Sequence, residues 1–158
     1  MFYSNALLKS TIRALVLAGI AAATLALSGC ATPTGVAFTT EAALATGQAQ
    51  VYLYRKSALY ASAQSFTVKL DQKDVGELFN GSYMQLPLAP GQHVISVKPG
   101  ALGKTYERTV QIADKQTQYL EFEMPAFLLG NAFHLGSTIA PRDTQQAKAD
   151  MQGLKGVK

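Results

Sequence analysis

Cysteine, histidine, tryptophan and long apolar runs are all scarce in this chain. Its 158 residues include one cysteine, two histidines and no tryptophan. One thiol cannot form an internal disulfide, and two separated histidines without further cysteines give too few ligands for a zinc site. We therefore expect no metal and no cofactor. No apolar run reaches the roughly 20 residues that a membrane-spanning helix needs.

The longest apolar run lies near the start of the chain. Residues Ala14 to Leu27 are almost wholly apolar, and Lys9 and Arg13 precede them without any acidic residue. The run has about 14 residues, which is too short to span a membrane, and a basic start before such a run is typical of an export signal. The sequence therefore predicts a signal peptide over residues 1–29.

The single cysteine follows this run directly. Leu27, Ser28 and Gly29 precede Cys30, and this order resembles the lipobox of bacterial lipoproteins. The resemblance implies that Leu27, Ser28 and Gly29 are recognised by the lipoprotein signal peptidase and that Cys30 receives a diacylglycerol on its sulfur. The two or three acyl chains of a mature lipoprotein hold it firmly on a membrane. The alternatives are a buried structural cysteine or a single-span anchor.

The residue after the cysteine indicates which membrane would hold the lipid anchor. By resemblance to the sorting rule of Gram-negative bacteria, Ala31 favours the outer membrane, because an aspartate there would signal retention in the inner membrane. We therefore expect a lipid anchor in the bacterial outer membrane, with the domain in the periplasm.

The charge of the chain gives little support for binding nucleic acid. Fourteen basic and ten acidic residues give a net charge of +4, but two of the basic residues lie in the expected leader, so the mature value is +2. The remaining cations are scattered, with no cluster beyond Arg55 and Lys56. No stripe suited to a phosphate backbone is present, so no nucleic-acid partner is expected.

The mature chain is long enough for one domain with one core. Residues 30–47 are rich in Thr and Ala and carry a single charge, which is typical of a tether. One helical turn is expected within residues 40–45, and Phe38 is a candidate for docking on the domain. The domain itself is expected over residues 48–158.

Beyond Gly47, apolar residues recur with a period of two. The pattern favours seven short strands separated by turn-forming residues, over residues 49–54, 66–70, 75–78, 82–86, 93–98, 106–112 and 119–124. Such spacing is typical of a sandwich or a small barrel, and we predict an all-β fold, an antiparallel β-sandwich of about seven strands. Its core is expected to contain Val51, Val68, Ile95, Val110 and Phe122.

One C-terminal helix is expected from about residue 143. Asp143 is suited to cap it, and Gln146 lies three residues later, as in a capping box. Ala147, Met151 and Leu154 form an apolar stripe at helical spacing, which is expected to pack on an open face or edge of a sheet.

Several short motifs resemble those of one bacterial family. They are Tyr54-Arg55, Val68 to Asp71, Val75-Gly76, Gly81 to Tyr83 and Pro90 to His93. Over about residues 48–125, and downstream of a lipobox, the set resembles the domain-of-unknown-function 2846 family of small bacterial lipoproteins. The Pro-Gly-x-His corner is also similar to PEGA-like and carboxypeptidase-regulatory-like domains, which implies a sandwich. Lys56 departs from the family pattern, which often has proline there. The family has no assigned reaction, so no catalytic residue is implied.

The residues give little reason to expect an enzyme. His93 and His134 are the two histidines, the chain has no Gly-x-Ser-x-Gly elbow, and lipidation of Cys30 would leave no free thiol. We expect His93 to fix a corner through hydrogen bonds, and we expect Asp71 and Asp74 to satisfy turn amides.

Two features are candidates for a binding surface. Tyr52, Tyr54 and Tyr119 lie on the outward parity of their strands, where tyrosines can stack on sugar rings or contact a partner. The segment 124–136, with Phe127 and Phe133, is very apolar and is either a buried crossover or an exposed patch for a partner or a membrane. The leading hypothesis is a non-enzymatic, lipid-anchored domain that contacts another envelope protein. The alternative is a module that binds glycan or a small ligand through the tyrosine face, and a hydrolase ranks third.

Overall fold

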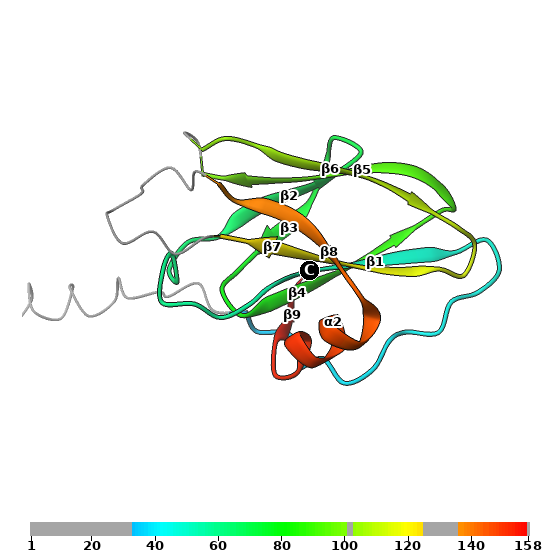
Figure 1. The fold of residues 1–158 in the computed structure, drawn as a ribbon, viewed down its shortest axis with the longest axis horizontal. Coiled ribbons are helices and arrows are strands. Elements are labelled where there is room, and N and C mark those ends of the chain that lie inside the picture. The colour runs from blue at the N-terminus through cyan, green and yellow to red at the C-terminus, as the bar shows by residue number, and fades with distance from the viewer. Residues whose placement is uncertain (1–32, 101–102, 125–135, 158) are drawn as a thin grey trace, which may run out of the picture. The chain divides into compact units, whose positions relative to one another are not determined.

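The alternating segments of the sequence form the strands of two sheets that pack face to face (Figure 1). The structure is a computed structural model, and it describes residues 33–100, 103–124 and 136–157. These residues belong to one compact unit. Several predicted positions lie outside the described residues, namely the leader 1–29, Cys30, Phe127, Phe133 and His134. No helix in the described part of the chain is long and apolar enough to cross a membrane.

Five strands form the first sheet and four form the second. The first has the order β8-β7-β1-β4-β9, and the second has the order β3-β2-β5-β6. The strands are β1 (Ala49–Arg55), β2 (Phe66–Leu70), β3 (Lys73–Leu78), β4 (Ser82–Leu88), β5 (Gly91–Pro99), β6 (Tyr106–Ile112), β7 (Thr117–Glu123), β8 (Thr138–Arg142) and β9 (Lys155–Val157).

The all-β sandwich is confirmed, but two details of the prediction are wrong. The described residues form nine strands rather than about seven, because β8 and β9 were missed. The first sheet is mixed rather than antiparallel, since β1 pairs with β7 and β4 pairs with β9 in parallel. β8 carries Pro141 and β9 has three residues, so neither shows a clear alternation of apolar and polar residues.

The core lies between the two sheets. All five predicted core residues are buried: Val51, Val68, Ile95, Val110 and Phe122 are between 0% and 4% exposed. The ring of Phe122, on β7 of the first sheet, lies 5.1 Å from that of Phe66 and 5.9 Å from that of Tyr106, which both belong to the second sheet. The period-two pattern therefore identified the inner face of each of these strands correctly.

The predicted turns also form. Asp71 and Gln72 both have positive φ, as a two-residue hairpin turn requires, and they connect β2 to β3. Gly81 has a φ of 67° and lies where the chain leaves β3 in one sheet and enters β4 in the other.

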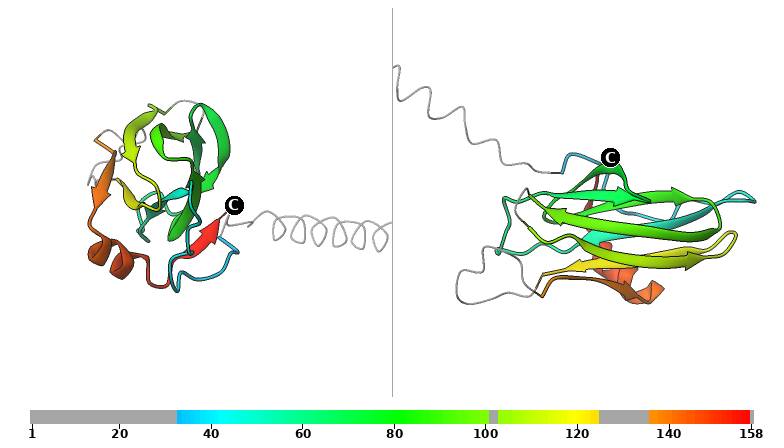
Figure 2. Two further views of the ribbon diagram at one scale, coloured as in Figure 1. Left: turned by 90° about the vertical axis from the view of Figure 1, so that its right-hand side faces the viewer. Right: turned by 90° about the horizontal axis from the view of Figure 1, so that it is seen from above.

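The predicted helix is confirmed as α2 (Thr144–Met151), on the outside of the sandwich (Figure 2). It ends before Leu154, which was expected in its apolar stripe and is buried after the helix, just before β9. The side chain of Asp143 accepts a hydrogen bond from the backbone N–H of Gln146, as expected of a cap. The reciprocal half of the capping box is absent in this described segment, because Gln146 Nε2 donates to Asp150 Oδ1 at 2.8 Å instead. Ala147 and Met151 are fully buried.

Candidate functional site

The tyrosine face of the first sheet is covered, which corrects the prediction of an exposed binding surface. Tyr52, Tyr54 and Tyr119 have the predicted parity, opposite to the core, but they are only 0–2% exposed. They form a second apolar cluster with Ala147 and Met151 of α2. The rings of Tyr52 and Tyr119 stack on each other at 5.6 Å. These tyrosines are therefore packing residues, and they are not available to stack on a sugar.

The predicted tether is docked on the domain, with hydrogen bonds and bridges that begin at Val36 and Ala37. Phe38 is 9% exposed, and its ring makes edge contacts with Tyr52 and Tyr83 at 5.6 and 5.5 Å. The backbone N–H of Phe38 donates to the carbonyl of Leu154 at 3.0 Å. The docking of Phe38 agrees with the prediction, whereas the described part of the segment 30–47 is neither free nor helical.

Further along, this segment is held by polar contacts. The backbone N–H of Ala42 donates to Tyr52 Oη at 3.2 Å. The carboxylate of Glu41 accepts a hydrogen bond from Tyr119 Oη and pairs with Lys148 Nζ of α2. The segment therefore connects the sheet to the helix.

A group of charged residues lies where β1 and β7 end. Glu121 is 3% exposed, and its carboxylate pairs with Lys56 Nζ at 3.0 Å and with Arg142 Nε at 2.9 Å. Lys56 also lies 3.5 Å from Asp150 of α2, which accepts a hydrogen bond from Tyr54 Oη. The hydrogen bond to Glu121 is the main cause of the raised pKa of Lys56. A buried carboxylate is tolerable here because two cations neutralise it.

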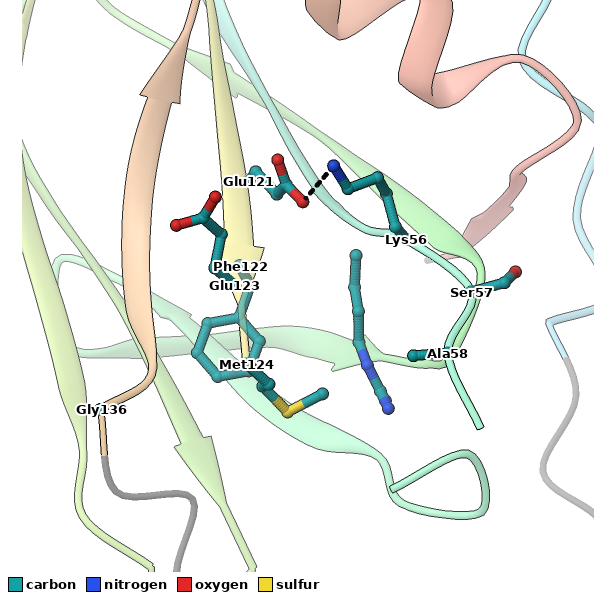
Figure 3. A pocket seen from close by; sticks show the side chains of 9 residues that line it. Lys56, Ser57, Ala58, Glu121, Phe122, Glu123, Met124 and Gly136 are labelled. Atoms are coloured by element: carbon teal, nitrogen blue, oxygen red, sulfur yellow. Dashed lines mark ion pairs between the residues drawn. The ribbon is translucent and has the colours of Figure 1, made fainter. Parts of the chain in front are cut away.

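These charges border an open crevice of about 420 Å³. Figure 3 shows Lys56 pointing toward Glu121, with Glu123 and Met124 along the same side. The crevice therefore presents groups of both signs beside a few apolar atoms. Its lining residues are Arg55, Lys56, Ser57, Ala58, Glu121, Phe122, Glu123, Met124 and Gly136.

Arg55 is the most unusual side chain of the crevice, because it is a buried cation without a carboxylate partner among the described residues. It is 1% exposed, and its guanidinium donates to the carbonyls of Ala61 and Gln64 at 2.7 and 2.8 Å. It also lies 4.8 Å from the ring of Phe66. Its Nε has no hydrogen-bond partner in the described structure. Burial lowers the pKa of Arg55 to about 10.

Arg55 therefore holds the loop 56–65, and replacing it with methionine should loosen that loop. The Arg55→Met variant keeps an unbranched apolar side chain but leaves the carbonyls of Ala61 and Gln64 without donors. We expect several-fold faster chymotryptic cleavage beside Leu59 and Tyr60. Arg55→Lys is the matched control. It keeps the charge but lacks the planar guanidinium that bridges two acceptors, so its cleavage rate should lie between those of the parent and of Arg55→Met. Unchanged cleavage in both variants would show that the loop is held in another way.

His93 has the structural role that the sequence predicts. Its Nδ1 lies 2.7 Å from Asp71 Oδ2, and its Nε2 lies 2.9 Å from the carbonyl oxygen of Ala89. The other oxygen of Asp71 accepts the backbone N–H of Val94 at 2.9 Å. Both ring nitrogens face acceptors, so the doubly protonated ring satisfies both contacts. Asp71 thus joins its own turn to β5, whereas Asp74 pairs with Lys69 at 3.1 Å.

This geometry predicts a pH-dependent contribution to stability. The hydrogen bond to Asp71 is the main cause of the raised pKa of His93, whose ordinary value is 6.5. The contribution is therefore complete below about pH 6.5 and is lost as the pH rises through the raised pKa. We expect His93→Ala to lower the free energy of unfolding by about 1 kcal/mol at pH 6 and by less at pH 9. Urea unfolding of both proteins at the two pH values measures this, and a deficit that grows with pH would contradict it.

The sequence did not single out Glu121, Arg142 or Asp150 as site residues. One sequence feature could have identified Glu121. It lies two residues after Tyr119 in the same strand, so both side chains are on one face of the sheet, the face that the helix covers. Arg55 was noted as part of a motif but was given no role. In the described part of the chain, no group of three or more His, Cys, Asp or Glu residues is placed to hold a metal ion.

Comparison with known proteins identifies one family. The family described as "Protein of unknown function (DUF2846)" matches residues 45–130, from just before β1 to beyond the end of β7. No curated protein and no solved structure matches the chain. The family match spans more than half of the sequence and includes the Tyr-Arg pair, both turns and the Pro-Gly-x-His corner. The chain belongs to the DUF2846 family, as those motifs predicted.

Proposed function

We propose that this chain is a lipoprotein, anchored through Cys30 to the bacterial outer membrane, whose non-enzymatic sandwich domain contacts another envelope protein in the periplasm. The observation that carries the proposal is the sequence Leu27-Ser28-Gly29-Cys30 directly after a short apolar run. The basic residues before this run, and its length, which is too short to span a membrane, are typical of a signal peptide. The four residues Leu27 to Cys30 that follow are therefore interpreted as a lipidation signal.

The docked segment supports a position close to the membrane. Ala37, which bridges to Lys155 at the edge of the domain, follows Cys30 by only seven residues. Fully extended, seven residues reach about 25 Å. A lipid on Cys30 would therefore keep the domain next to the bilayer, and its partner would be a protein at the same membrane surface.

The crevice supports a protein partner rather than a glycan. Its rim carries Lys56 and Glu123, whose side chains are 50% and 39% exposed, so groups of both signs are accessible. Charged side chains of a protein match such a rim, whereas glycan recognition was expected to use the tyrosines that are now buried. His93 also has both ring nitrogens occupied, which supports a structural role for this histidine.

Site-specific photo-crosslinking in intact cells tests this function. A photoreactive amino acid at Ser57, which lines the crevice, should give a discrete adduct with an envelope protein. The same amino acid at Ala89, an exposed position at the opposite end of the strands, is the matched control and should give none. Identical adducts from both positions, or no adduct from Ser57, would contradict the proposal. Retention on purified glycan without any protein adduct would favour the glycan-binding alternative.

A further inference from the structure

We infer that one end of the sandwich is a surface that contacts the lipid bilayer. This end, called the anchor end below, is where β1 and β7 finish. We assign the contact with lipid to Val36, Leu59, Lys104 and Lys155, whereas the crevice beside them is left to a protein at the same membrane surface. The inference rests on the proposed lipid anchor at Cys30. It goes further because it assigns the orientation of the domain and the residues that touch lipid.

The docked segment begins at this end of the domain. The carbonyl of Val36 accepts hydrogen bonds from Gly156 N–H at 2.8 Å and from Tyr83 Oη at 3.3 Å. Gly156 pairs with Tyr83, one residue from the pair between Ser82 and Arg55 that ends β1. Val36 thus lies at the same level along the strands as the last residues of β1, with β4 and β9 between them, and it follows Cys30 by six residues. Those six residues reach about 20 Å at most.

Two exposed apolar side chains lie at the same end. Among the residues that the structure describes, the large hydrophobic side chains that stand out in solvent are Leu59, at 99%, and Val36, at 80%. Leu59 lies in the loop 56–65, which continues from the end of β1 (Figure 1). The guanidinium of Arg55 fixes this loop through Ala61 and Gln64, so Leu59 is presented by an ordered loop. A single exposed leucine means little, but two such residues beside a lipid attachment point fit an interface with acyl chains.

Two exposed lysines at this end are suited to a phospholipid surface, and the carboxylates of Glu121 and Glu123 at the same end are paired with Lys56 and Arg142. Lys104 lies in the connection from β5 to β6, whose ends belong to the anchor end because Pro99 pairs with Phe66. Lys155 pairs with Ser82 at the same end. Both lysines are exposed, and neither forms an ion pair with a carboxylate of the described residues. Lysines at this position are suited to the phosphates of anionic lipids.

The opposite end of the sandwich is formed by polar turns. Its turns contain Asp71, Gln72, Asp114 and Lys115, which are polar and exposed. Ala89, at the corner between β4 and β5, is also exposed and small. The two ends therefore differ in the way expected if one meets lipid and the other faces the aqueous periplasm.

Fluorescence on vesicles tests the inference with the full lipidated protein. Acylation of Cys30 would remove the only native thiol, so Leu59→Cys and Ala89→Cys each provide a single attachment site for an environment-sensitive dye. We would reconstitute both in vesicles of phosphatidylethanolamine and phosphatidylglycerol that contain lipids with a quencher on the acyl chain. The dye at position 59 should be quenched several-fold more than the dye at position 89. Equal quenching at the two positions would overturn the inference.

A second variant separates insertion of the leucine from insertion of the dye. The dye is placed on Ser62→Cys, in the same loop, with or without Leu59→Asp. Quenching should fall several-fold when aspartate replaces Leu59, and unchanged quenching would contradict a role for this residue. The intact mass of each sample reports acylation separately. An acylated protein whose loop stays unquenched overturns this inference and leaves the anchor intact, whereas a protein without acyl chains overturns both.

Discussion

Replacing Phe122 with alanine should lower the free energy of unfolding by about 3 to 5 kcal/mol, the largest stability effect that we expect from one substitution. The side chain is 2% exposed and lies between the rings of Phe66 and Tyr106. Its removal deletes apolar contacts between the two sheets and leaves a cavity that rigid strands cannot close fully. Urea unfolding of a preparation that lacks residues 1–29 gives the value.

A matched substitution on a strand surface shows whether the loss is specific to the core. Thr109 lies exposed on β6, and Thr109→Ala should change the free energy of unfolding by no more than about 0.5 kcal/mol. The loss of unfolding free energy in Phe122→Leu should lie between those of the two alanine variants, because leucine retains much of the buried volume. If Phe122→Ala cost no more than Thr109→Ala, the residue could not lie in the core.

Replacing Cys30 with serine should abolish lipid attachment, the largest effect that we expect on location. Serine has nearly the same size, but it lacks the thiol to which the diacylglycerol would be linked. Palmitate labelling should fall to background, and the protein should remain an unprocessed precursor or leave the membrane fraction. Thr34→Ala, four residues later, is the control and should label and fractionate as the parent does. Normal labelling of Cys30→Ser would contradict the lipoprotein proposal.

Most of the fold was predictable because the relevant signal is local. The alternation around Val51, Val68 and Phe122 reports which side of each strand is buried, without any knowledge of the partner strand. The cap at Asp143 and the spacing of Ala147 and Met151 identify α2 in the same way. Strand pairing is different, because the parallel pair β1–β7 joins residues more than sixty positions apart and leaves no trace in a period-two pattern.

The candidate site was less predictable because its environment comes from distant segments. Parity placed Tyr52 and Tyr119 correctly on the face opposite the core, but whether that face meets water depends on α2 and on Phe38. Arg55 next to Lys56 looks like an ordinary pair of surface cations in the sequence. Only the loop that folds back over Arg55 makes its side chain a buried one.

His93 shows the opposite case. Its position after the Pro90-Gly91 corner, and on the same strand face as Ile95, was enough to predict a structural role. The contacts with Asp71 and Ala89 are local to one end of the strands, so the sequence contained nearly all the necessary information.

The intact mass of the protein purified from bacterial envelopes tests the central claim most directly. If the chain is a lipoprotein, the mass corresponds to a polypeptide that begins at Cys30 and carries a diacylglycerol and, in the fully mature form, one further acyl chain. Fragmentation then places the lipid on the N-terminal cysteine. A mass equal to the unmodified full-length chain, or to a polypeptide cleaved elsewhere with a free thiol, would contradict the account.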